Sequence, residues 1–252
     1  MSKQVVQDNS RALDQFYTKS PVAKNCVDFL RSTVPEFDQA KFIEPSAGKG
    51  AFLQYLPIDT VALDLYPLAE NIVKKDFLQW KKPKELQGFI IAVGNPPFGQ
   101  NASLALQFIN KCAEFSSIIA FILPKTFKKS FYQDRINLNF WLEAELDLEP
   151  NSFEFDNKEK SVPCVFQVWR RKDIPRTKNE LITKHNDFEF TNRESADFAI
   201  RRVGRLAGKV ILNYTDYATA SHYFIKSKVQ KDELVRRLQE IDWSVIKENT
   251  AG

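Results

Sequence analysis

The chain has 252 residues, of which 43% are hydrophobic and 27% are charged, a composition typical of soluble globular proteins. No apolar run is long enough to span a membrane, and the first fifteen residues lack the apolar stretch of a secretory signal. Cys26, Cys112 and Cys164 are far apart and form no CxxC pair, which argues against a disulfide framework or a zinc site. We therefore expect a cytoplasmic protein with reduced cysteines, no metal and no membrane association.

Positive charge is concentrated in the carboxyl-terminal third. Residues 170–252 contain 17 Lys or Arg and 12 Asp or Glu, whereas the formal net charge of the whole chain is +4. The polar, basic stretch RRKDIPRTK begins at residue 170. We predict a core over residues 1–170 and a small basic module over residues 171–252 that faces a polyanion, with an ordinary solvated surface as the alternative.

The amino-terminal part combines a short extended segment with a helix. The sequence DQFYT, residues 14–18, is followed by Ser20 and Pro21 and then by apolar residues at helical spacing. This pattern predicts a helix with Ser20 as its N-cap and Pro21 at its first position.

A strand, a small-residue turn and a helix are predicted next. Residues 41–44 form the strand, Pro45–Gly50 form the turn, and the helix begins at Ala51. Glycines let a ligand approach the backbone, and a helix N-terminus attracts negative charge, so this order is typical of a cofactor turn. The pattern ExxxGxG differs from the GxGxxG and P-loop patterns, which disfavours pyrophosphate. A glycine turn without a ligand is the alternative.

Two later strands end in acidic residues. The strand over residues 60–65 contains Asp64, 20 residues after Glu44, and acidic residues at this position of Rossmann-like sheets bind ribose hydroxyls. A short strand over residues 71–75 precedes Asp76 and Phe77. That pair places a carboxylate and an aromatic ring together at a third strand end, with a helix cap and a core phenylalanine as the alternative.

The apolar run over residues 88–93 predicts a buried parallel strand, which Gly94, Asn95, Pro96 and Pro97 end. The prolines restrict the backbone, so Asn95 is held at the edge where open α/β sheets bind ligands. The Asn95 amide oxygen and the Pro96 carbonyl are uncharged acceptors suited to an exocyclic amine, and Phe98 offers a face for a base. The alternative is a tight turn whose phenylalanine joins the core.

The remaining core elements are a helix over residues 104–115, a buried strand over 117–123, and two strands over 142–148 and 162–169 that pair antiparallel. Lys125 follows the buried strand, at the ligand edge, and is a candidate phosphate contact. Phe153 lies in the intervening polar loop, where it either packs in the core or stacks on an extruded base.

The basic module contains a predicted hairpin over residues 198–203 and 209–212, a strand over 222–227 and a helix over 229–241. Arg201, Arg202 and Arg205 make this module the best candidate for a nucleic-acid surface.

The motifs DQFYT, EPSAGKG, ALDLYP, KDF, GNPPFG and LPKTF, in this order, resemble the motif set of class I S-adenosylmethionine-dependent N6-adenine methyltransferases, in an arrangement similar to the gamma DNA amino-methyltransferases. The resemblance covers residues 13–170. It implies an α/β Rossmann-like fold with a mostly parallel seven-stranded sheet, a terminal antiparallel hairpin and a small α+β module after the core. It also implies a cofactor site at Phe16, Tyr17, Thr18, Glu44, Pro45, Ser46, Ala47, Gly48, Gly50, Asp64, Leu65, Asp76 and Phe77, and a catalytic loop at Asn95, Pro96, Pro97 and Phe98.

The expected function is therefore transfer of a methyl group from S-adenosylmethionine to the N6 amine of adenine in DNA, after base flipping. RNA is the second candidate substrate, because the NPPFG loop and the strand KSVPCVFQVW also resemble compact RNA adenine methyltransferases, and because the carboxyl-terminal part is short for DNA target recognition. Two further hypotheses are methylation of a protein glutamine amide and a catalytically silent nucleic-acid-binding module. Cys164 lies inside a strand, which disfavours a cytosine-C5 nucleophile.

Overall fold

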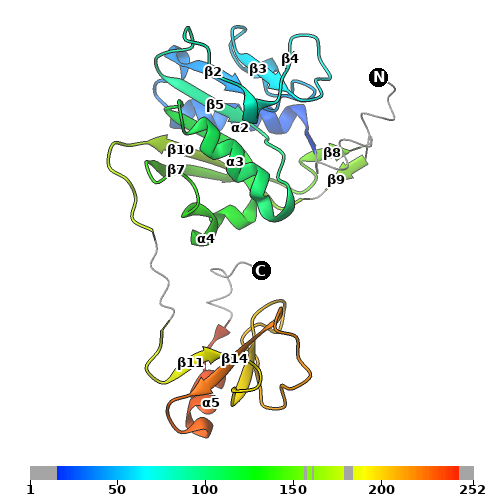
Figure 1. Ribbon diagram of the computed structural model, residues 1–252. Coiled ribbons are helices and arrows are strands. Elements are labelled where there is room, and N and C mark those ends of the chain that lie inside the picture. The colour runs from blue at the N-terminus through cyan, green and yellow to red at the C-terminus, as the bar shows by residue number, and fades with distance from the viewer. Residues whose placement is uncertain (1–15, 156–157, 161, 179–183, 244–252) are drawn as a thin grey trace. The chain divides into compact units, whose positions relative to one another are not determined.

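The computed structural model describes residues 16–155, 158–160, 162–178 and 184–243 (Figure 1). The chain divides into two compact units, and the first extends through Lys178, past the boundary predicted after residue 170. The last strand of that unit continues to Arg171, and the backbone N–H groups of Lys172 and Arg176 donate to Asn139 and Leu138 carbonyls at 2.7 Å. The polar, basic stretch that begins at residue 170 is thus hydrogen-bonded to the first unit.

A seven-stranded sheet forms the centre of the first unit, with the strand order β4-β3-β2-β5-β6-β10-β7 (Figure 1). Its members are β2 (Lys41–Glu44), β3 (Val61–Asp64), β4 (Val73–Lys74), β5 (Ile90–Gly94), β6 (Ile118–Pro124), β7 (Phe140–Asp147) and β10 (Cys164–Arg171). Strands β2 to β6 pair in parallel, and β10 lies antiparallel between β6 and β7. The predicted α/β Rossmann-like sheet with a terminal antiparallel pair is confirmed.

The apolar runs become the central strands because both sheet faces are covered. Every residue of β5 is buried, as are residues 118–123 of β6. Helix α2 (Ser20–Thr33) and helix α3 (Ser103–Cys112) lie on opposite faces of the sheet (Figure 1). Shorter helical elements are η1 (Phe37–Gln39), η2 (Leu53–Tyr55), η3 (Phe77–Gln79), η4 (Gln100–Ala102), η5 (Lys125–Lys128) and α4 (Ser130–Gln133).

Two local expectations near the start of the unit are wrong. Lys19, not Ser20, occupies the N-cap of α2, because the Ser20 hydroxyl bonds instead to Gln54 Oε1 at 3.0 Å and Tyr55 Oη at 2.7 Å. The helix expected from Ala51 is only the single turn η2. Pro57 follows closely, and a proline disfavours helical geometry in the residue before it.

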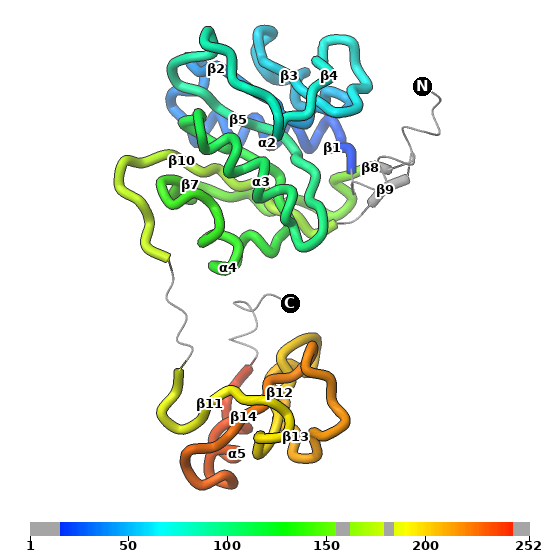
Figure 2. The backbone as a smooth tube through the Cα atoms, viewed as in Figure 1, coloured from blue at the N-terminus to red at the C-terminus, as the bar shows by residue number. Residues whose placement is uncertain are grey.

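A small second sheet in the first unit was not predicted. It consists of β1 (Tyr17–Thr18), β8 (Phe153–Phe155) and β9 (Lys158–Lys160), all antiparallel. Figure 2 shows β1 beside β8 although the two are far apart in sequence. This pairing holds Tyr17 and Thr18 of the DQFYT motif beside Glu154 and Phe153.

Over residues 184–243, the second unit consists of an antiparallel sheet and one helix. The strands, in the order β11-β14-β12-β13, are β11 (Phe188–Thr191), β12 (Phe198–Arg201), β13 (Val210–Ile211) and β14 (His222–Ser227), and the helix is α5 (Lys231–Gln239). The predicted hairpin, the strand over residues 222–227 and the helix are present, whereas β11 was not predicted. No helix among the described residues is long and apolar enough to cross a membrane.

Candidate active site

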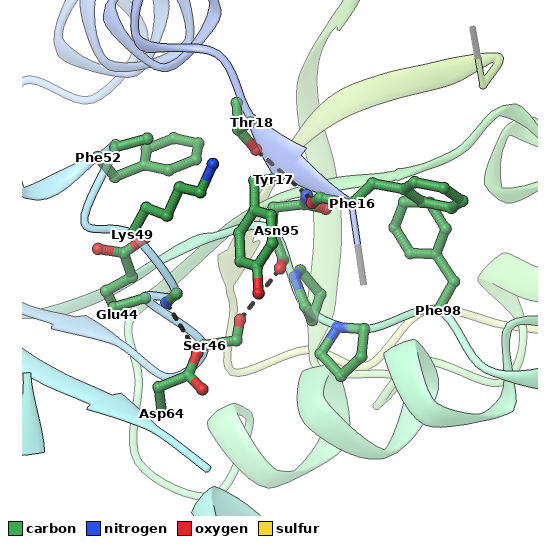
Figure 3. Close-up of a pocket in the computed structure, with 15 residues that line it drawn as sticks. Phe16, Tyr17, Thr18, Glu44, Ser46, Lys49, Phe52, Asp64, Asn95 and Phe98 are labelled. Carbon is green, nitrogen blue, oxygen red and sulfur yellow. Dashed lines mark hydrogen bonds between the residues drawn. The ribbon is translucent and has the colours of Figure 1, made fainter. Parts of the chain in front are cut away.

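A pocket lies at the carboxyl ends of the central strands, where four separate chain segments meet (Figure 3). These segments are Phe16 with the strand β1, the end of β2 with the turn after it, the end of β3, and the loop after β5. The lining residues are Phe16, Tyr17, Thr18, Glu44, Ser46, Ala47, Gly48, Lys49, Ala51, Phe52, Asp64, Asn95, Pro96, Pro97 and Phe98. The structure therefore brings together all four predicted catalytic residues and eight predicted cofactor residues.

The side-chain amide of Asn95 is oriented by β1. Its Nδ2 donates to the Phe16 carbonyl at 2.9 Å and to Thr18 Oγ1 at 3.1 Å. Because a carbonyl oxygen only accepts, this contact identifies the amide nitrogen and leaves Oδ1 on the other side. Oδ1 is buried and has no hydrogen-bond partner among the residues that the structure describes. An unsatisfied buried acceptor beside a pocket is suited to an N–H donor from a ligand.

The backbone of the NPPF loop is rigid. The Phe98 carbonyl accepts from the Leu104 and Ala105 N–H groups at 3.1 and 3.2 Å. Gly99 has φ = +68°, and an added Cβ would lie 2.8 Å from Leu104 Cβ, so only glycine fits there. Phe98 is only 8% exposed and packs in the core, as expected for a tight turn with a core phenylalanine, while still lining the pocket.

The glycine turn approaches the ring of Tyr17. Gly48 has φ = +53°, and an added Cβ would lie 3.1 Å from Tyr17 Cε1. The Gly48 N–H donates to Asp64 Oδ2 at 2.7 Å, and Tyr66 N–H donates to Oδ1 at 2.7 Å. Since a carboxylate accepts up to about four hydrogen bonds, Asp64 retains free acceptor positions.

Two acidic side chains of the site are buried. Glu44 is 2% exposed, and within the described part of the chain its Oε2 has no hydrogen-bond partner. Burial, with a smaller contribution from the charge of Asp64, raises the pKa of Glu44 well above its ordinary value. Burial also raises the pKa of Asp64, although the hydrogen bonds from Tyr66 and Gly48 act in the opposite direction.

The pocket also includes Lys49, Ala51 and Phe52, which are not among the residues predicted from the sequence. Lys49 Nζ lies 2.6 Å from Glu154 Oε1 and 4.8 Å from the centre of the Tyr17 ring. This lysine therefore connects the glycine turn with both β1 and β8. Its position between Gly48 and Gly50 was the only feature of the sequence that could have indicated that Lys49 lines the pocket.

Five predicted cofactor residues are not among the described residues that line the pocket: Pro45, Gly50, Leu65, Asp76 and Phe77. Asp76 caps η3 through the Leu78 N–H at 3.0 Å and also accepts from Gln79. Phe77 is 2% exposed and stacks with Trp80 at 6.1 Å. Their geometry matches a cap followed by a core phenylalanine, and their cofactor role stays a prediction.

The predicted substrate residues are dispersed. Lys125 lies 3.8 Å from Asp147, on β7. Phe153 is fully buried, 6.4 Å from the Phe16 ring, which does not fit stacking on an extruded base. Arg201, Arg202 and Arg205 belong to the second unit. The assignment of these five residues to substrate binding stays a prediction. The burial of Phe153 argues against its predicted role.

The three cysteines are free and buried. Burial raises the pKa of Cys164 to about 12, so its thiolate is scarce at neutral pH. Among the described residues, no group of three or more His, Cys, Asp or Glu side chains is arranged to hold a metal.

The strand order and the pocket at the sheet edge define the class I methyltransferase fold. A solved structure of a proposed RNA methyltransferase from Pyrococcus horikoshii is similar, with a TM-score of 0.51 and 16% identity over 63% of this chain and 87% of that one. An N-methyltransferase, NodS, from Bradyrhizobium japonicum WM9 gives a TM-score of 0.38 and 10% identity over 61% of this chain and 98% of that one.

By sequence, the chain is 33% identical over 138 residues to the protein ENHANCED DOWNY MILDEW 2 of Arabidopsis thaliana. The match covers 48% of this chain and 10% of that protein, so the chain spans about a tenth of this relative. No protein-family profile matches the chain.

Proposed function

We propose that this chain transfers a methyl group from S-adenosylmethionine to the N6 amine of adenine in a nucleic acid, with DNA as the first candidate substrate and RNA as the second. The observation that carries the proposal is the Asn95 Oδ1 atom, buried beside the glycine-turn pocket without a partner. Its orientation follows from the hydrogen bond between Nδ2 and the Phe16 carbonyl.

The reaction requires an acceptor of this kind. The lone pair of an adenine N6 amine is delocalised into the ring, so the amine is a weak nucleophile. Hydrogen bonds from its two N–H groups to Asn95 Oδ1 and the Pro96 carbonyl would favour tetrahedral nitrogen and direct the lone pair. Both acceptors are uncharged and held by a rigid loop, so orientation and polarisation supply the catalysis.

The residues around the glycine turn fit the cofactor. S-adenosylmethionine supplies an electrophilic methyl group on a sulfonium. The unpartnered Oε2 of Glu44 matches a cationic group, and the remaining acceptor positions of Asp64 match ribose hydroxyls. The absence of a side chain at Gly48 lets the turn lie close to Tyr17, since an added Cβ would lie 3.1 Å from Tyr17 Cε1.

The target base must leave a duplex to reach this pocket. The part of Phe98 that faces the pocket is available to a flipped base, although most of the ring is buried. RNA is retained because of the resemblance of the NPPFG loop to compact RNA adenine methyltransferases, and the similar Pyrococcus horikoshii protein is described as a proposed RNA methyltransferase.

The test is a methylation assay with labelled S-adenosylmethionine on DNA, RNA and protein mixtures, followed by digestion and identification of the labelled residue. Label on N6-methyladenine is the expected result. Label confined to glutamine would contradict the nucleic-acid assignment, and cofactor binding without transfer to any of the three would support the silent binding module.

A further inference from the structure

The second unit carries two hollows that share one wall. A polar pocket lies among Thr191, Arg193, Arg202, His222 and Phe224, and an apolar groove lies among Phe188, Ile200, Gly208, Ile225, Leu238 and Trp243. Phe190, Tyr223 and Arg202 line both hollows. We call these three residues the ridge.

The ridge exposes two aromatic rings on the sheet. Phe190 is 53% exposed and Tyr223 is 45% exposed, and their ring centres are 5.2 Å apart. The guanidinium of Arg202 lies 5.4 Å from the centre of the Tyr223 ring. Exposed rings next to an arginine are the usual means by which proteins hold unpaired bases.

The polar pocket contains polar atoms without partners. His222 is 3% exposed and lines the pocket, and among the described residues neither its Nε2 nor the Nε of Arg193 has a hydrogen-bond partner. His222 Nδ1 lies 2.9 Å from the Ser221 hydroxyl, which can donate or accept, and 3.2 Å from the Ala218 carbonyl, so these contacts are compatible with both tautomers of the ring. The pocket thus brings together a donor from Arg193 and a ring nitrogen of His222.

The local charge is complementary to a polyanion. The segment from β12 to β13, residues 201–209, contains Arg201, Arg202, Arg205 and Lys209 and no acidic residue. Two acidic residues of the neighbouring strand region are paired, Glu189 with Lys228 at 3.4 Å and Asp187 with Arg237 at 2.7 Å. Glu194 lines the polar pocket and opposes the charge of Arg193 and Arg202 there.

From these observations we propose that the second unit binds unpaired nucleotides of a nucleic-acid strand. The bases stack on Phe190 and Tyr223 along the apolar groove, and the backbone phosphates meet Arg202 and Arg193 at the polar pocket. A ridge between a polar and an apolar hollow matches a nucleotide, which has a charged end and a flat apolar end. Bases in a duplex are stacked internally and do not reach the rings. The proposal deepens the proposed function, on which it rests for its substrate class.

The first test measures binding of labelled single-stranded RNA and DNA oligonucleotides, and of the corresponding duplexes, to the full chain. The variant with both Phe190→Ala and Tyr223→Ala should bind single strands about fivefold to a hundredfold more weakly. Leu212→Ala is the matched control, because Leu212 is 52% exposed in the same unit and lines neither hollow. It should change affinity less than twofold. Undiminished binding by the double variant, preference for duplex, or no binding by the unmodified chain would overturn the proposal.

The second test separates stacking from charge. Arg202→Gln should reduce the slope of log affinity against log salt by about 0.7, the contribution of one phosphate contact to a single strand. Arg202→Lys should restore the slope, because lysine keeps the point charge. An unchanged slope in Arg202→Gln would remove the phosphate contact from the proposal.

Calorimetry with S-adenosylmethionine and methyl-transfer assays on the same variants distinguish this proposal from the function on which it rests. Ridge-dependent strand binding without methyl transfer would contradict the proposed function alone. If the chain methylates adenine but the variant with Phe190→Ala and Tyr223→Ala binds single strands as tightly as the unmodified chain, only the proposal that the ridge binds nucleotides would be contradicted.

Discussion

The side-chain nitrogen of Asn95 donates a 2.9 Å hydrogen bond to the main-chain carbonyl of Phe16. This contact joins the loop after β5 to β1, which is itself paired with β8. The orientation of the proposed acceptor thus depends on three segments that are distant in sequence. An asparagine held in this way keeps Oδ1 directed away from β1 without having to reorganise when a substrate amine arrives.

Replacing Asn95 tests the catalytic assignment. Asn95→Ala should lower the rate of methyl transfer by about a hundredfold to a thousandfold, as does the loss of one preorganised hydrogen-bonding group in other enzymes. Affinity for S-adenosylmethionine should change little. Gln87→Ala is the control, because Gln87 carries an exposed amide bonded only locally, to the Lys84 carbonyl. Full turnover in Asn95→Ala would refute the role of the amide.

A pair of glycine substitutions separates backbone strain from contact with Tyr17. Gly48→Ala and Gly88→Ala each place a side chain at positive φ, +53° and +91°, and each should lower the free energy of unfolding by about 1 kcal/mol. Only the Gly48 substitution meets Tyr17, whereas nothing lies within 4 Å of a Cβ at Gly88. Chemical denaturation should give similar losses for both. Titration with S-adenosylmethionine should show weakened binding for Gly48→Ala alone, and equal affinities would exclude a role for this close approach.

The parts of the site that the sequence predicted are those set by strand ends. An apolar run followed by glycine or proline fixes where a parallel strand stops, and the carboxyl ends of such strands meet at one edge. Glu44, Asp64 and Asn95 follow or end β2, β3 and β5, so their convergence could be anticipated. The strand predicted over residues 222–227 has the same bounds as β14, His222–Ser227.

The features that could not be predicted from the sequence depend on contacts between segments that are far apart in the chain. Strand β1 pairs with β8, which also pairs with β9, and nothing local in the sequences of β1 and β8 specifies that they are partners. Ser20 was a reasonable N-cap by local rules, but Tyr55 competes for its hydroxyl. Phe77 and Phe153 were assigned to the site from the sequence, but both are buried. The sequence alone does not distinguish an aromatic residue that contacts a ligand from one that packs in the neighbouring core.

Cys164 provides a test against covalent catalysis. Because burial raises its pKa to about 12, a thiol reagent should not modify it in the folded protein near neutral pH. Cys164→Ala should retain methyl transfer, with some loss of stability from the small cavity it leaves. Mass spectrometry after alkylation and a turnover assay provide the two readouts. Loss of turnover in a variant that remains folded would reopen a nucleophilic role.

The pKa of Glu44 predicts a pH dependence of stability. Because this pKa is raised in the folded state, the folded protein holds a proton that the unfolded chain releases above about pH 4.3. The contribution of Glu44 is therefore fully present below that pH and is lost as pH rises through the folded-state pKa. In denaturation curves, Glu44→Gln should lose less stability than the unmodified chain as the pH rises from the unfolded-state pKa to the folded-state pKa of Glu44. Glu36→Gln is the opposite control, because hydrogen bonds from Arg170 lower the pKa of Glu36, so its contribution is lost as pH falls.

The same carboxyl group should couple cofactor binding to proton release. S-adenosylmethionine carries a sulfonium and an ammonium, and a positive charge near Glu44 favours the ionised carboxylate, which lowers its pKa. Binding measured by calorimetry in buffers of different ionisation enthalpy should therefore reveal net proton release at pH values below the raised pKa of the free protein. The release should disappear in Glu44→Gln and persist in Glu36→Gln, whose side chain pairs with Arg170 outside the pocket. Identical proton release in both variants would show that Glu44 does not face the charged part of the cofactor.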